Sequence, residues 1–139
     1  EHNSVRNSAG IFDVSHMNIF DFCGVEAKEF MRHVLTNDVN KIDDGSALYS
    51  VITNNEGGII DDLIVYKFNN EKFRVVSNCS TFDDVNNFFE SNIIKFYIKN
   101  YPKNRTKNTK YRDYDFHSLM KMEIPQEDII HLTTINKHL

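Results

Sequence analysis

Cysteine and tryptophan are scarce: the chain of 139 residues has two cysteines, Cys23 and Cys79, and no tryptophan. Two cysteines are too few for a disulfide scaffold or a cysteine-based metal site. The six histidines are scattered, and no two have the i, i+4 spacing that places two ligands on one helix face. We therefore expect no metal site.

Long apolar runs and a strong charge of either sign are also lacking. No run reaches the roughly 20 apolar residues that a membrane-spanning helix needs. The net charge is -4, so the overall charge does not indicate nucleic-acid binding. The hydrophobic fraction of 40% and the aromatic fraction of 12% are typical of a folded domain with a core. We therefore expect a folded domain that uses neither a membrane nor a nucleic acid as partner.

The segment 47–78 is the most informative part of the sequence. It contains three apolar runs rich in β-branched and aromatic residues, and these runs are separated by turn-forming strings at 54–58 (N-N-E-G-G) and 69–71 (N-N-E). This pattern predicts three antiparallel strands in a meander.

Two adjacent carboxylates, Asp61 and Asp62, lie inside the middle run. A buried carboxylate requires hydrogen-bond donors or a cation, or it takes up a proton. Neighbouring side chains on a strand point to opposite faces, so the two carboxylates cannot share one site. We expect one to face solvent or a sheet edge and the other to face a pocket. The spacing is equally compatible with both lying at a strand end, where they are solvated or cap a turn.

The remaining pattern predicts an alternation of helices and strands. The expected elements are a helix end over 1–9 stopped by a left-handed Gly10, a strand over 11–22 broken by Gly24, a helix over 25–35, a helix that starts at an N-cap Ser80 and runs to about Lys95, and a final strand over 129–135. The order α-β-α-β-β-β-α-β predicts an α+β fold, with an antiparallel-rich sheet and two amphipathic helices on one face.

A basic stretch over 101–115 differs from the rest in composition. Lysines and arginines alternate there with Asn and Thr, and three tyrosines are interspersed. The segment could bind a phosphate or polyanion through its charges and stack on its rings. Its composition favours a solvated insertion instead. We therefore divide the chain into a lobe over 1–98, a basic insertion over 99–117 and a divergent continuation over 118–139.

Several local strings resemble the glycine cleavage system T-protein, an aminomethyltransferase. They are E-H-N-S-V-R-N-S-A-G-I-F-D-V-S-H-M at 1–17, T-N-D-V at 36–39, A-L-Y-S at 47–50, G-G-I-I-D-D-L-I-V-Y at 57–66 and V-V-S-N at 75–78. They follow the order and spacing of that family and cover about residues 1–95. The resemblance fades after about Ser91.

The resemblance implies a folate-binding enzyme. Members of the family take an aminomethyl group from the dihydrolipoyl arm of H-protein, release ammonia and pass the one-carbon unit to tetrahydrofolate. For a eukaryotic source, the resemblance implies a mitochondrial location. Whole T-proteins are far longer and hold folate in a central hole between three lobes, so we expect this chain to be a fragment or a truncated gene product.

The resemblance also assigns roles to individual residues. The catalytic aspartate of the family falls on Asp62, which we expect to be buried and to face a cavity where it assists the folate N10. Further folate-contacting positions fall on Met17, Tyr49, Val76 and Asn78. Without the motif context, a structural role is the favoured interpretation for each of these four residues. Met17 would fill the core, Tyr49 would be a cross-strand core aromatic, Val76 ordinary core and Asn78 a strand-end or helix-cap residue.

Two alternatives to the transferase remain open at this point. The first is a non-catalytic folate-binding relative of the kind that supports iron–sulfur cluster assembly, although the K-G-C-Y-x-G-Q signature typical of those proteins is absent from this sequence. The second is an inactive remnant in which no site forms.

Overall fold

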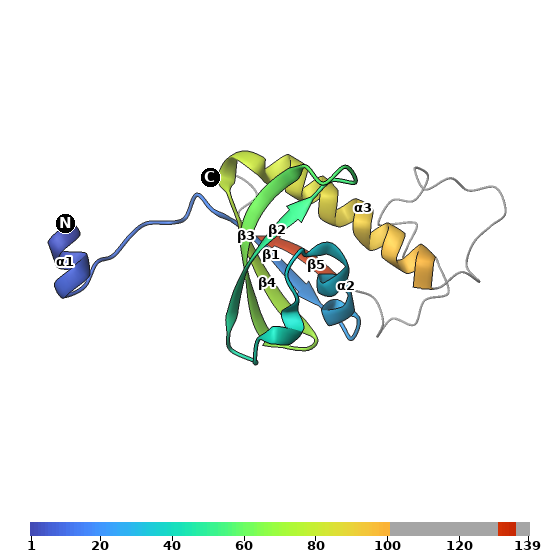
Figure 1. Cartoon of the computed structure of the whole chain (residues 1–139), viewed down its shortest axis with the longest axis horizontal. Coiled ribbons are helices and arrows are strands. Elements are labelled where there is room, and N and C mark those ends of the chain that lie inside the picture. Colours follow the sequence, from blue (N-terminus) through green and yellow to red (C-terminus); the bar gives the residue numbers. More distant parts are fainter. Residues whose placement is uncertain (101–130, 136–139) are drawn as a thin grey trace.

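A computed structural model describes residues 1–100 and 131–135 of the chain. The main elements follow the predicted order (Figure 1): α1 (His2–Asn7), β1 (Asn18–Cys23), α2 (Ala27–Val34), β2 (Ala47–Thr53), β3 (Ile59–Asn69), β4 (Lys72–Ser77), α3 (Phe82–Asn100) and β5 (His131–Ile135). Two short 3-10 turns, η1 (Val39–Lys41) and η2 (Cys79–Thr81), precede β2 and α3. The predicted order of helices and strands is confirmed.

The strands form one antiparallel sheet with the order β2-β3-β4-β1-β5. The predicted meander over 47–78 is therefore confirmed. Its first turn is closed by Asn54, whose side-chain Oδ1 accepts from the backbone N–H of Glu56 and of Gly58 at 3.0 and 2.8 Å. Gly57 has φ +84°, a left-handed conformation that explains the glycine at this point of the turn.

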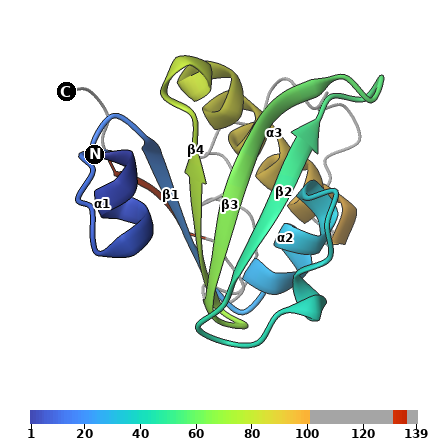
Figure 2. The ribbon, with the colours of Figure 1, turned by 60° about the vertical axis from the view of Figure 1, so that its left-hand side comes forward.

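Alternation along the strands gives the sheet one buried face and one open face. On β1 and β4, every second residue is buried and the residues between are half-buried or exposed. Phe20, Phe22, Phe73 and Val75 are fully buried. Helices α2 and α3 lie on the same side of the sheet and cover this face (Figures 1 and 2). The predicted α+β architecture, with two helices on one face, is confirmed.

Aromatic rings join the helices to the sheet. Phe89 of α3 packs edge-on against Phe22 at a centroid distance of 4.9 Å and against Phe20 at 5.4 Å. Phe30 of α2 contacts Phe22 and Phe96 at 5.7 Å each. Because these rings come from both helices and from β1, they fix the helices against the central part of the sheet.

The predicted strand over 11–22 is wrong at its beginning. β1 starts at Asn18, which pairs with Ser77, the last residue of β4. Residues before Asn18 therefore have no ladder partner on this neighbour. Asp13 Oδ1 instead accepts from the backbone N–H of Ser15 at 2.9 Å, which turns the chain, and Ile11 is fully exposed. The predicted end of this strand at Gly24 is confirmed, since β1 ends at Cys23.

Two predicted helix signals are also wrong. The C-cap of α1 is Ser8, and Gly10 does not have a positive φ. Ser80 does not cap α3 but lies within η2, which leads directly into the helix at Phe82. In both cases the residue type is common at helix ends, but the residue does not occupy the capping position in this chain.

Helix α3 is longer than the predicted end near Lys95, because its described part runs to Asn100. The expected strand over 129–135 is confirmed for His131–Ile135. The basic stretch over 101–115 lies outside the described residues, so its role and the three-part division of the chain stay predictions. No helix in the part of the chain that the structure describes could cross a membrane.

Candidate functional site

The two adjacent aspartates of β3 face opposite sides of the sheet, as the strand geometry predicts. Asp61 is the buried one, with 5% of its surface exposed, and it lies on the side that the helices cover. Asp62 is exposed on the open face. The expectation that Asp62 is buried is therefore wrong, because the helices cover the face to which Asp61 belongs.

Asp61 caps the connection between β4 and α3. Its Oδ2 accepts from the backbone N–H of Asn78 at 3.0 Å and from the Thr81 hydroxyl at 2.8 Å. Its Oδ1 accepts from the side-chain amide of Asn78 at 2.7 Å. These donors satisfy a carboxylate that would otherwise be costly to bury. Asp61 lies within β3 and not at its end, so the turn that it caps belongs to the neighbouring β4.

Asp62 is the centre of a hydrogen-bond cluster on the open face. The Tyr49 hydroxyl donates to its Oδ2 at 2.9 Å, and the Asn78 side-chain amide donates to its Oδ1 at 3.1 Å. The register explains the first contact, since Tyr49 of β2 pairs with Ile64, two residues along the same face of β3. Three of the five predicted site residues, Tyr49, Asp62 and Asn78, are therefore in direct contact.

The electrostatic effect of this cluster is visible at Tyr49. The hydrogen bond to Asp62 raises the pKa of the Tyr49 phenol, and desolvation together with the nearby carboxylates raises it further. The phenol therefore stays protonated and remains a donor to Asp62 over a wider pH range.

Val76 lies on the same face as the cluster, and Met17 directly precedes β1. Val76 of β4 is half-buried and pairs with Ile64 of β3 and Ile19 of β1, so it lies on the same open face as Asp62. Met17 directly precedes β1, and the next residue, Asn18, donates from its side chain to the carbonyl of Asn78 at 2.6 Å. This contact holds the residue after Met17 at the end of β4, and the role of Met17 itself stays a prediction.

The open face carries exposed apolar side chains on β2 and along β3 from Asp62 towards the other end of the strand. Tyr49 is 61% exposed, Ile64 40%, Tyr66 39% and Phe68 46%. Contiguous apolar surface of this kind marks binding sites or interfaces more often than plain solvent contact. Tyr49 and Ile64 pair across β2 and β3, so they form a flat apolar surface beside the Asp62 carboxylate.

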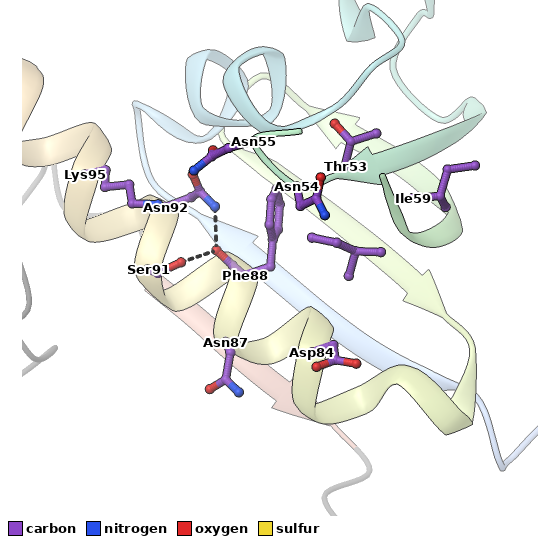
Figure 3. Close-up of a pocket in the computed structure, with 11 residues that line it drawn as sticks. Thr53, Asn54, Asn55, Ile59, Asp84, Asn87, Phe88, Ser91, Asn92 and Lys95 are labelled. Atoms are coloured by element: carbon purple, nitrogen blue, oxygen red, sulfur yellow. Dashed lines mark hydrogen bonds between the residues drawn. The ribbon is translucent and has the colours of Figure 1, made fainter. Parts of the chain in front are cut away.

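A pocket of about 460 Å³ lies elsewhere, between the β2–β3 turn and α3 (Figure 3). Phe88 of α3 projects into it towards the turn. Ile59 and Ile60 also line it, and most of the other lining residues are polar, including Asn54, Asn87, Ser91 and Lys95. None of the five predicted site residues lines this pocket. This pocket is therefore not the cavity expected in front of Asp62, and that cavity stays a prediction.

Sequence reasoning did not identify Asp61 and Thr81 as parts of this site. Both act through Asn78, which they hold at the end of β4. Asn78 at the end of a strand, followed three positions later by Thr81, is a weak turn signal in the sequence. This signal does not predict the contact with Asp61 of the neighbouring strand. Among the described residues, no group of His, Cys, Asp and Glu is arranged to hold a metal ion.

Comparison with known proteins connects this geometry to a family. Residues 1–109 match the family described as the GCVT N-terminal domain. The chain is 53% identical over 81 residues to an aminomethyltransferase of Alcanivorax borkumensis, covering 58% of this chain and 22% of the relative. It is 45% identical over 100 residues to the aminomethyltransferase of Nitrosococcus oceani, covering 71% of this chain and 27% of the relative.

A solved structure agrees with both sequence comparisons. The crystal structure of the glycine cleavage system aminomethyltransferase T from Bartonella henselae superposes with a TM-score of 0.56 at 31% identity, over 58% of this chain and 22% of that one. The chain thus spans about a quarter of the length of these relatives. Since the family match covers well over half of the 139 residues, this chain belongs to the GCVT N-terminal domain family.

Proposed function

We propose that this chain forms the folate-binding part of an aminomethyltransferase of the glycine cleavage system. In this reaction the enzyme takes the aminomethyl group carried on the dihydrolipoyl arm of H-protein, releases ammonia and transfers the one-carbon unit to tetrahydrofolate. The observation that carries the proposal is the carboxylate of Asp62, held on the open face of the sheet by Tyr49 and Asn78 in a chain of this family.

The position of Asp62 suits a group that handles protons. Asp62 pairs with Val51 of β2, and the ladder with β4 begins at the next residue, Leu63, so the sheet holds the backbone around Asp62. Each carboxylate oxygen receives one hydrogen bond, which orients the group while leaving lone pairs for a ligand. A fixed carboxylate can accept a proton from an attacking amine or orient its N–H, as the proposed role at the folate N10 requires.

The exposed ring of Tyr49 provides a surface for the folate. Its phenol is held by Asp62, so the ring has little freedom to leave the sheet. A flat aromatic surface next to a fixed carboxylate suits a ligand that combines a heteroaromatic ring with amine nitrogens. We propose that the pteridine or its linker packs here, with Val76 and Met17 at the margin.

We further propose that other parts of a whole enzyme cover this face. The relatives are about four times as long as the aligned segment, and the apolar residues around Asp62 are open to solvent in this chain. Ligand sites enclose most of their ligand, so the chain alone should bind tetrahydrofolate weakly. A mitochondrial location stays a prediction from the resemblance, since the relatives named above are bacterial.

The direct test is transfer activity of Asp62→Asn in the protein of natural length, with H-protein and tetrahydrofolate. Loss of a proton-accepting group costs typically 100- to 10,000-fold, so we expect the rate to fall by about 100-fold or more while tetrahydrofolate still binds. Asp21→Asn is the matched control, because Asp21 is also a carboxylate on the open face but is paired with Arg74 at 2.7 Å. It should keep its activity.

The outcomes separate the proposal from its alternatives. Equal activity of Asp62→Asn and the wild type would refute the catalytic role. Tetrahydrofolate binding without any transfer by the wild type would favour a non-catalytic folate-binding relative. No binding at all would favour an inactive remnant.

A further inference from the structure

The side-chain amide of Asn78 has one defined orientation. Its Nδ2 lies 2.7 Å from Asp61 Oδ1, 3.1 Å from Asp62 Oδ1 and 3.2 Å from the Asp62 carbonyl oxygen. All of these groups accept hydrogen bonds and, when the carboxylates are ionised, none can donate. A rotated amide would place Oδ1 against them, so Nδ2 must face the two aspartates.

Asp61 is the group that holds this orientation from the buried side. It accepts hydrogen bonds from both the backbone N–H and the side-chain amide of Asn78, so it fixes the backbone and the side chain of that residue together. It is 5% exposed, and hydrogen bonds to a shielded carboxylate are stronger than those between neutral groups. The shortest contact of the Asn78 amide is to Asp61 and not to the exposed Asp62.

The amide therefore has no donor left for a ligand. Its two N–H bonds are directed at the aspartates, and no residue that the structure describes donates to its Oδ1. Asn78 can then offer a ligand an acceptor only.

We propose that Asp61 is a positioning residue for the candidate site, an inference that rests on the proposed function. Asp61 fixes Asn78 from the covered side of the sheet. The amide N–H of Asn78 then donates to the Asp62 carboxylate, and its amide oxygen is left to accept a hydrogen bond from the ligand. The ligand group recognised at Asn78 is then an N–H donor, which a reduced pteridine ring carries. A ring that presents only an acceptor at this point is rejected, because two acceptors would face each other.

The test is nuclear magnetic resonance of the Asn78 side-chain amide in the wild type, in Asp61→Asn and in Thr81→Val. In the wild type, we expect the Asn78 amide protons to be shifted from those of the exposed Asn70 and to exchange with solvent at least about 10-fold more slowly, as a charge-assisted hydrogen bond allows. Asp61→Asn should remove both differences. Thr81→Val removes the contacts of the Thr81 hydroxyl to Asp61 and to the Asn78 carbonyl, but it keeps both contacts of Asp61 to Asn78. The shift and the slow exchange of the Asn78 amide protons should therefore remain in this variant.

A merely structural role predicts another result. Both variants would then lower the midpoint of unfolding while leaving the Asn78 amide signals in place, and this outcome would overturn the proposal. If Asp61→Asn does not fold, the wild-type measurement decides: Asn78 amide signals that match those of Asn70 contradict the proposed orientation. Tetrahydrofolate binding is measured separately, so its absence would refute the proposed function while the amide signals still decide the role of Asp61.

Discussion

Phe89 is expected to be the most sensitive position of the core that supports the candidate site. Its ring is fully buried and packs edge-on against Phe20 and Phe22 of β1. Replacing Phe89 by Ala loses roughly 2–3 kcal/mol of apolar burial and about 1–2 kcal/mol from the two ring contacts. The free energy of unfolding should therefore fall by about 3–5 kcal/mol, the range known for such truncations in cores.

Urea unfolding followed by circular dichroism measures this change. Ile59→Ala is the control, because Ile59, the first residue of β3, is also apolar but is 72% exposed. It should change the free energy of unfolding by no more than about 0.5 kcal/mol. If Phe89→Ala costs no more than Ile59→Ala, the helix does not pack on the sheet through these rings, and the described core is wrong.

Three further predictions concern the open face and its turns. Asp62→Asn should lower the pKa of Tyr49 towards its ordinary value, which a carbon-13 titration of the phenol measures. Because the pKa of Tyr49 is raised in the folded protein, the phenol stabilises the fold relative to Tyr49→Phe fully below about pH 10. This stabilisation is lost as the pH rises through the raised pKa. Arg74→Ala should cost about 1 kcal/mol of unfolding free energy, and less in high salt, because its two-point contact with Asp21 is partly exposed. Gly57→Ala should cost about 1 kcal/mol in urea unfolding, through its φ of +84° alone, since an added Cβ would meet open space.

Local patterns in the sequence predicted most of the fold. The meander followed from β-branched runs between Asn- and Gly-rich turns, and α2 followed from its apolar stripe. These features depend on neighbours in sequence, so period and turn chemistry suffice. The prediction that this strand begins at Ile11 was wrong, because a strand also needs a pairing partner. The partner strand β4 ends at Ser77, opposite Asn18.

The candidate site was predicted less completely than the fold. Strand geometry correctly placed Asp61 and Asp62 on opposite faces, but it could not say which face the helices cover. That choice depends on how α3 packs after η2, which is a tertiary contact. For the same reason the orientation of Asn78, which depends on a carboxylate 17 residues away, could not be read from the sequence.

The account depends on the open face around Asp62 being the folate surface, and a tetrahydrofolate titration monitored by nuclear magnetic resonance tests this most directly. The account predicts that the signals of Tyr49, Val76 and Asn78 shift with added tetrahydrofolate, with weak affinity in this chain and a larger effect in the protein of natural length. Shifts confined to Asn87 and Lys95, in the pocket beside α3, or no shift at all in either protein, would contradict it.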